Sequence, residues 1–261
     1  CLTAVSEANL IDDPLRLLRG LRLMAEIPLT ISSQTMAWIE RHGARLPEAA
    51  PERILAELQR LVAGPHADAA LDCLQRLKLL APWSDASCSA PPVPDPKAAA
   101  EMTIVERQTA LSLARLTALI GDPGLEQLRA SRLLRQRCRN LRRWSIHLKD
   151  QSDEISTLSE QNRLQLHRDL EADLPALILQ LPHQLRGPWL ERWRDQDDPL
   201  FHPAAPLDGT VLQQELGITP GPELGRLLEH LRHERAFGRI AGRTAALEEA
   251  NRWKSHQGGA L

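Results

Sequence analysis

Apolar residues recur at helical spacing along nearly the whole chain, and no run of alternating polar and apolar residues is long enough to predict a strand. Aromatic residues are scarce, with six Trp, two Phe and no Tyr. The core must therefore be built mainly from Leu and Ala, which favour helices over strands. We predict an all-α protein, an elongated series of helices that is long enough to bury more than one core.

Helix start and stop signals divide the chain. Asp13-Pro14 supplies an N-cap acid followed by Pro at the first helical position, and Leu15, Leu18 and Leu21 follow as an apolar stripe. Further helices are expected at about 33–42, 51–63, 66–80, 102–120, 125–149, 159–181, 188–193, 208–216, 222–237 and 244–253. Residues 84–96, rich in Pro and Ser, cannot hold a regular element and form the best candidate for a linker.

Several classes of protein are disfavoured. The four cysteines lie far apart, without the spacing of a zinc site or of a disulfide framework. The apolar runs are too short to span a bilayer, and no signal peptide precedes the first helix, so we expect a cytoplasmic protein. The chain opens at Cys1 without Met, which we interpret as the sign of a fragment.

Residues 11–24 carry the clearest chemical signal. We expect Asp12 and Asp13 at the positive end of a helix, where carboxylates are favoured. Arg16, Arg19 and Arg22 recur every three residues opposite the leucines. An Asp acceptor one turn from an Arg donor can read the edge of a nucleobase. The alternative is an N-capped amphipathic helix whose acids and arginines pair locally.

The run Asp-Asp-Pro-Leu-Arg-Leu-Leu-Arg at 12–19 resembles the nucleotide-selecting element of class II tRNA nucleotidyltransferases and bacterial poly(A) polymerases. The resemblance implies that Asp13 and Arg16 bind the base of CTP or ATP, that Asp12 braces Arg16, and that Arg19 supports the site. Many relatives carry Glu at the first acid, so Asp12 departs from the pattern.

The similarity continues through two other segments. Residues 50–58 resemble a Glu-Arg-Ile-x-x-Glu-Leu helix of the family, in which Arg53 and Glu57 would tie the neck together. A surface ion pair within one helix is the alternative for these two residues. Residues 206–209 and 216–228 resemble the tail of the family. We therefore predict a neck with the nucleotide-selecting helix at 1–82, a linker at 83–97, a helical body at 98–200 and a tail at 201–261.

Members of this family also carry a catalytic head with a Gly-Gly-x-Val-Arg-Asp run and an Asp-x-Asp pair, whose carboxylates hold Mg²⁺. We expect this head to lie before Cys1 and predict no catalytic residue and no metal ligand in residues 1–261. The isolated chain is accordingly expected to be inactive.

Arginine also clusters between 129 and 149, where no acid interrupts it. An inward stripe of Leu134, Cys138, Leu141 and Leu148 would leave the cations facing outward. Such a face can hold RNA phosphates by releasing counterions, and a solvated face with balancing acids is the alternative. The predicted RNA-binding residues are Arg129, Arg132, Arg135, Arg139, Arg142 and Arg143.

The resemblance thus implies the nucleotide-selecting and tRNA-binding part of an enzyme that adds CMP and AMP to tRNA 3′ ends, with CTP and ATP as substrates and the tRNA acceptor end as partner. A poly(A) polymerase or a split CC- or A-adding enzyme is an alternative of the same class. A stand-alone helical RNA-binding protein is an alternative of another class.

Overall fold

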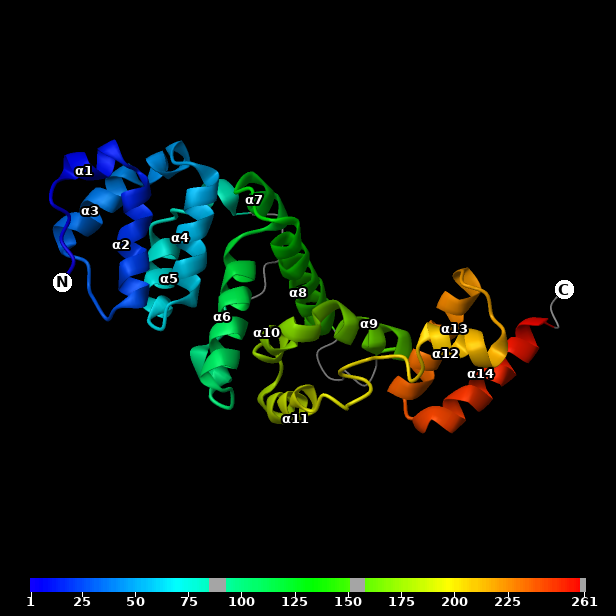
Figure 1. Ribbon diagram of the computed structural model, residues 1–261. Coiled ribbons are helices and arrows are strands. Elements are labelled where there is room, and N and C mark those ends of the chain that lie inside the picture. The colour runs from blue at the N-terminus through cyan, green and yellow to red at the C-terminus, as the bar shows by residue number, and fades with distance from the viewer. Residues whose placement is uncertain (85–92, 151–157, 259–261) are drawn as a thin grey trace. The chain divides into compact units, whose positions relative to one another are not determined.

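The computed structural model describes residues 1–84, 93–150 and 158–258, and most of these residues lie in helices (Figure 1). Among these residues the only β pairing is an isolated parallel bridge between Leu2 and Ile31. The all-α prediction is confirmed. No helix in this part of the chain is both long and apolar enough to cross a membrane. Most of the expected linker, residues 85–92, lies outside the described residues.

The chain divides into two compact units. One comprises Cys1–Asp150 with Pro175–Arg186, and the other comprises Gln151–Leu174 with Gly187–Leu261. The four domain boundaries expected from the sequence stay predictions.

The first part of the chain, up to the arginine-rich helix, alternates α-helices with short 3₁₀ turns. The elements are α1 (Glu7–Asp12), α2 (Leu15–Glu26), α3 (Ser33–His42), η1 (Gly43–Glu48), α4 (Pro51–Ala63), α5 (Ala67–Arg76), η2 (Ala81–Trp83), η3 (Pro96–Ala99), α6 (Ile104–Leu119), α7 (Asp122–Gln127) and α8 (Arg132–Asp150).

Helix α2 packs against both α4 and α5 (Figure 1). Its residues Leu15, Leu18 and Leu21 are fully buried, which is the apolar stripe that the sequence indicates. The backbone approaches closely where α4 ends. A Cβ on Gly64 would lie 2.4 Å from the carbonyl oxygen of Ala25, so no larger residue fits there without a shift of the backbone.

Helix α6 joins this group of helices to α8 and contacts both α4 and α8. A capping box starts it, in which the Thr103 side chain accepts from the Glu106 N–H and the Glu106 carboxylate accepts from the Thr103 N–H. The buried Arg115 of α6 donates to the carbonyl oxygen of Val62 at 3.0 Å and to Asp68 at 2.8 Å. An arginine inside the unit thus ties α6 to the end of α4 and the start of α5.

The second part of the chain departs from the expected helix at 159–181. That segment is broken into α9 (Glu160–Leu170), η5 (Glu171–Asp173) and α10 (Leu174–Ile178), and Glu171 takes the positive φ of 40° at the break. The remaining helices follow the sequence signals more closely. They are α11 (His183–Arg194), α12 (Gly209–Leu216), α13 (Pro222–Ala236) and α14 (Gly242–Gly258).

Helices α12, α13 and α14 share a core of leucines that includes Leu212, Leu227 and Leu231. Arg239, which follows α13, donates to Glu234 at 2.7 Å and to Glu160 of α9 at 2.9 Å. This paired guanidinium links the α12–α14 group to α9 within the second unit.

A buried histidine lies in the same unit. His167 of α9 is 2% exposed, and its ring centroid lies 4.1 Å from that of Phe201 and 5.5 Å from that of Trp189. Burial among these rings lowers the pKa of His167 to about 3 because a charged imidazolium would lose its hydration there. The folded protein therefore holds His167 neutral.

His167 predicts how stability depends on pH. The unfolded chain binds a proton at His167 below a pKa of about 6.5, whereas the folded ring stays neutral down to about pH 3. Stability from this residue is thus complete above about pH 6.5 and declines as the pH falls, by at most about 1.4 kcal/mol per pH unit. Denaturant unfolding between pH 7 and pH 4 should show a smaller decline in His167→Phe than in the parent. The exposed His256→Phe is the matched control, and equal declines in all three proteins would contradict the assignment.

Candidate nucleotide and RNA interface

The Asp12-Asp13-Pro14 segment forms a corner between two helices. Asp12 is the last residue of α1, Asp13 is extended with φ −134° and ψ 91°, and Leu15 begins α2. The expectation that Asp12 and Asp13 both lie at the positive end of one helix is therefore wrong. The residue before α2 is Pro14, and no side chain caps the helix. Local capping thus does not occupy the Asp13 carboxylate.

Asp13 and Arg16 lie side by side at this corner. Oδ2 of Asp13 is 3.6 Å from Nε of Arg16, and the two side chains are 27% and 46% exposed. The pair is loose and open to solvent, so each partner retains hydrogen-bonding capacity. The carboxylate offers only acceptors and the guanidinium only donors.

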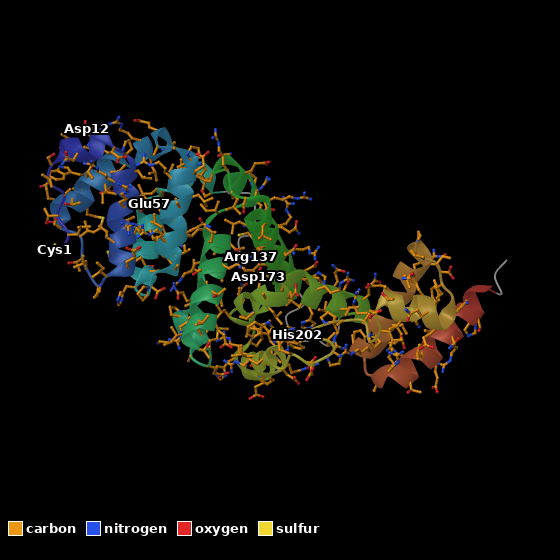
Figure 2. All side chains as sticks on the ribbon, viewed as in Figure 1. Cys1, Asp12, Glu57, Arg137, Asp173 and His202 are labelled. Carbon is orange, nitrogen blue, oxygen red and sulfur yellow. The ribbon has the colours of Figure 1, made fainter. Side chains whose placement is uncertain are left out.

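The structure does not show the bracing role expected for Asp12. Asp12 is exposed at the end of α1 (Figure 2), and within the described residues no hydrogen bond or ion pair joins it to Arg16. Its charge acts instead on Arg45, whose pKa is raised chiefly by the hydrogen bond to Glu48 and to a smaller extent by Asp12. The carboxylate next to Arg16 is therefore that of Asp13.

One buried carboxylate on α4 pairs with α2 and holds that helix in place. Glu57 of α4, labelled in Figure 2, lies 3.0 Å from Nε of Arg19 and 2.6 Å from Nε of Arg22. The side chains of Glu57 and Arg22 are only 10% and 11% exposed. A carboxylate so shielded from water has to be paired, and here two arginines of α2 pair with it.

Glu26 at the end of α2 extends this network. It pairs with Arg22 on its own helix and, at 2.9 Å, with Arg60 of α4. Burial alone would raise the pKa of the Glu26 carboxyl, but the hydrogen bond and charge of Arg22 and the charge of Arg60 hold that pKa below its usual value. Two carboxylates and three arginines therefore connect α2 to α4.

The alternative considered for Arg53 and Glu57, an ion pair between the two within α4, does not form. Arg53 is exposed and makes no side-chain hydrogen bond or ion pair with any described residue, whereas Glu57 faces α2. Glu57 does tie two helices together, but its partners are Arg19 and Arg22. The three-residue spacing of these arginines was the signal in the sequence, because it places both on one side of α2.

Replacing Glu57 tests this network. Glu57→Gln leaves Arg22 buried with one partner fewer, and we expect the free energy of unfolding to fall by about 3 kcal/mol. Glu52→Gln on the same helix removes only an exposed pair with Arg129 and should change stability little. Urea unfolding of both variants is the measurement, and similar stabilities for the two would contradict the account.

The arginines around α8 that are predicted to bind RNA divide into an exposed group and one buried residue. Arg129, Arg135 and Arg139 are partly or fully exposed and pair with Glu52, Glu126 and Asp122, at 2.6, 2.9 and 3.2 Å. Arg132 is exposed and has no side-chain partner among the described residues, and Arg143 is exposed beside Trp144. These five arginines offer cations to solvent.

Arg142 does not face outward, contrary to expectation. It is 5% exposed, and its guanidinium donates to the carbonyl oxygens of Thr117 and Ile120 at 3.2 and 2.7 Å while it pairs with Asp122. These carbonyls belong to the end of α6, where backbone acceptors lack helical partners. Arg142 therefore secures α6 to α8, and we remove it from the set of RNA-binding residues.

Acidic side chains of the described residues do not gather into a metal site. Across the described residues, no group of three or more His, Cys, Asp and Glu side chains could hold a metal ion. Asp195 and Asp197 do have Asp-x-Asp spacing, but Asp195 accepts the backbone N–H of Asp197 at 3.0 Å and so shapes a turn. The residues that the structure describes therefore do not fit a magnesium centre.

Comparisons with known proteins show which proteins the chain resembles. Residues 28–84 match a family model described as the probable RNA and SrmB-binding site of polymerase A. A CC-adding tRNA nucleotidyltransferase of Synechocystis sp. is 28% identical over 95% of this chain and 66% of its own length.

Solved structures agree on the fold. The Thermotoga maritima CCA-adding enzyme complexed with tRNA matches 95% of this chain and 62% of its own with a TM-score of 0.63 and 15% identity. The Bacillus stearothermophilus CCA-adding enzyme in complex with CTP matches 96% and 65% with a TM-score of 0.59 and 20% identity. The chain spans less than two thirds of the length of these proteins. The resemblance is thus confirmed: the chain is similar over most of its length to a CC-adding tRNA nucleotidyltransferase, and it shares the fold of CCA-adding enzymes.

Proposed function

We propose that this chain is the nucleotide-selecting and tRNA-binding part of a template-independent enzyme that adds CMP, or CMP and AMP, to tRNA 3′ ends. The observation that carries the proposal is the exposed Asp13–Arg16 pair, held on a helix that Glu57 fixes from below. The proposal implies CTP and ATP as substrates and the tRNA acceptor end as partner. It also includes a cytoplasmic location, where such a tRNA substrate is processed.

The Asp13–Arg16 pair supplies the two kinds of group that reading a base requires. The Asp13 carboxylate accepts from an exocyclic amino group, which cytosine and adenine both carry, and the Arg16 guanidinium donates to neighbouring acceptors. Uracil offers a carbonyl in place of the amino group, and guanine offers one at the corresponding edge. Both bases would set a carbonyl oxygen against the carboxylate, so both are disfavoured.

Arg19 contributes to the recognition of the base only indirectly. Its guanidinium is engaged by Glu57 at 3.0 Å and remains 42% exposed, one turn after Arg16 on α2. We propose that Arg19 orients the helix and adds positive charge beside the nucleotide. Asp12 and Arg53 are assigned no contact with the nucleotide.

RNA binding is proposed for the exposed arginines around α8. Arg132, Arg139 and Arg143 recur along one side of that helix at exposed positions, and Arg129 and Arg135 flank them. The ion pairs of Arg129, Arg135 and Arg139 are exposed and therefore weak, so RNA phosphates can replace their carboxylate partners. The face thus binds phosphate without reading sequence.

The alternatives receive less support. The relatives described above are named for CC or CCA addition, which favours tRNA ends over poly(A) tails. Similarity to a nucleotidyltransferase over 95% of this chain also disfavours a separate origin as a stand-alone RNA-binding protein.

The chain by itself should not incorporate nucleotides. The described residues build no cluster of carboxylates for Mg²⁺, and we assign no catalytic step to them. Purified chain incubated with tRNA, CTP, ATP and Mg²⁺ is therefore expected to give no extended product on a sequencing gel. The same tRNA with an intact CCA-adding enzyme is the positive control. Extension that copurifies with the chain through successive columns would place catalysis within these residues.

Asp13→Asn tests base reading in a protein that joins this chain to a nucleotidyltransferase head. The amide swaps an acceptor for a donor, so selectivity for CTP and ATP over UTP and GTP should fall by about 1–3 kcal/mol. Thermal stability should stay unchanged, because no side chain caps α2. Single-nucleotide incorporation with the four triphosphates is the measurement, and Asp12→Asn is the matched control. Unchanged selectivity in Asp13→Asn would contradict the proposed role of Asp13 in selecting the base.

The cationic face is tested by the salt dependence of tRNA binding. In a variant with Arg132→Gln, Arg135→Gln and Arg139→Gln, the plot of log affinity against log salt should flatten by about 0.7–0.9 for each lost phosphate contact. Arg41→Gln removes an exposed arginine of α3 and is the control. A slope equal to that of the parent would show that these arginines only face solvent.

A further inference from the structure

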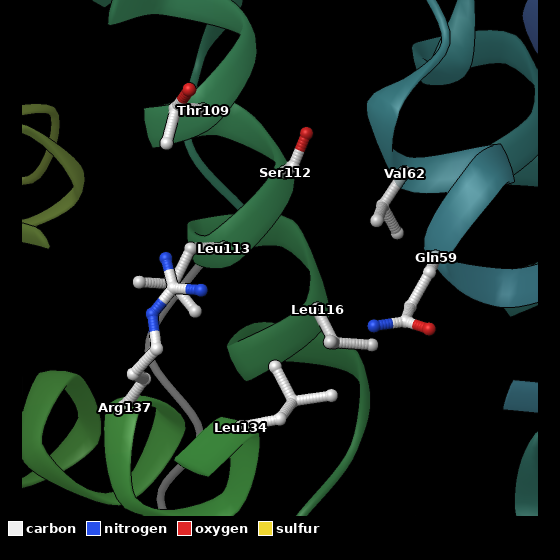
Figure 3. A pocket seen from close by; sticks show the side chains of 8 residues that line it. All are labelled: Gln59, Val62, Thr109, Ser112, Leu113, Leu116, Leu134 and Arg137. Carbon is white, nitrogen blue, oxygen red and sulfur yellow. The ribbon is translucent and has the colours of Figure 1, made fainter. Parts of the chain in front are cut away.

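A cavity of about 190 Å³ lies within the first unit, among α4, α6 and α8. It is a surface pocket open to solvent, since Gln59 and Thr109 in its lining are exposed. Figure 3 shows the side chains that line it. They are Gln59, Val62, Thr109, Ser112, Leu113, Leu116, Leu134 and Arg137.

The walls of the cavity are apolar. Val62, Leu113 and Leu116 are buried, and Leu134 of α8 lies below Leu116 in Figure 3. A cavity of about 150 Å³ with aliphatic and aromatic walls is large enough to bind benzene. A space of about 190 Å³ therefore suits one planar ring system somewhat larger than benzene.

Polar side chains also line the cavity. The Gln59 amide reaches from α4 toward Leu116, and the hydroxyls of Thr109 and Ser112 lie along α6 (Figure 3). An amide both donates and accepts, as do hydroxyls, so the edge of a heterocycle can be hydrogen-bonded here. A purely aliphatic ligand would leave these groups unused.

The Arg137 guanidinium extends along Leu113 in Figure 3. Its planar face can stack on an aromatic ring while its edge keeps other partners. The lining residues also include no acid, so nothing in the wall repels an anionic ligand. Leucine walls, a guanidinium plane and a rim of amide and hydroxyl groups together match the faces and edges of a heterocyclic base.

We propose that this cavity is a second nucleotide site, separate from Asp13 and Arg16, which takes one nucleobase. The base enters with its faces between the leucines and Arg137, and its edge meets Gln59 and the hydroxyls of α6. The base can belong to a free nucleotide or to an unpaired position of an RNA strand, and the two sources share this chemistry. The proposal rests on the cavity and not on the proposed function.

The experiment follows the methyl NMR signals of Leu113, Leu116 and Leu134 in the full chain during titration with CMP, with AMP and with a short single-stranded RNA. We expect these methyl signals to shift. Thr109→Trp places an indole at an exposed lining position and should weaken binding by about five-fold or more, the scale of one stacked base. Gln75→Trp on α5 is the matched control and should bind as the parent does.

The comparison of ligands identifies the source. Saturation by RNA at concentrations well below those of CMP and AMP assigns the site to an RNA strand, and equal concentrations assign it to free nucleotides. Gln59→Ala, which keeps the walls, should also weaken binding. Arg16→Ala should leave the shifts intact, so a failure of base selection at the α2 corner is told apart from a failure here.

Two results would overturn the proposal. The first is that no nucleotide or RNA moves the leucine methyl signals of the parent chain. The second is that the shifts persist unchanged in a folded Thr109→Trp variant, whose folding is checked by circular dichroism. Inorganic phosphate is the further control, and shifts of the same size with phosphate alone would also contradict a base site.

Discussion

The candidate site depends on the ion pairs that the Glu57 carboxylate forms with two arginines of α2. A carboxylate that is nearly removed from water is costly unless cations pair with it, and Arg19 and Arg22 of α2 do so at 3.0 and 2.6 Å. Hydrophobic contact between α2 and α4 is non-directional and would tolerate rotation or sliding. Two charged contacts from one acid fix both the rotation and the register of α2. The exposed Asp13–Arg16 pair at the start of that helix is thereby held in a defined place.

Arginine serves two purposes in this protein, which composition alone does not separate. Arg115 and Arg142 are buried and donate to backbone carbonyls near helix ends, where acceptors lack helical partners. A guanidinium suits this use because it stays charged, is weakly hydrated and carries several donors in one plane. Arg132 and Arg139, in contrast, are exposed on α8. Burial rather than residue type therefore decides which arginines are exposed to solvent.

The sequence predicted local structure well because helix signals are local. The apolar stripe of α2 and the helix at 33–42 come from neighbours within one or two turns, and the structure has both. The break at Glu171 was missed because it depends on a positive φ that no residue type in the segment indicates. The corner at Asp12 and Asp13 was missed because Ser6 starts a separate short helix, which the Asp-Pro signal obscured.

Partner choice was the least predictable feature of the site. Arg53 and Glu57 have the spacing of a pair within one helix, yet Glu57 lies on the side of α4 that faces α2 and Arg53 does not. Arg142 occupies a run that looks uniformly cationic, but helical rotation turns it toward the end of α6. Both outcomes depend on how helices far apart in the sequence pack together, which the pattern of a single helix does not contain.

We propose that this chain binds the acceptor end of a tRNA. Hydroxyl-radical footprinting of end-labelled tRNA, with and without the chain, tests it most directly. We expect protection along the acceptor stem that fades as salt rises, with the anticodon arm cleaved as in free tRNA. Protection centred on the anticodon arm, or a footprint identical to that of free tRNA at concentrations where the chain is in excess, would contradict the account.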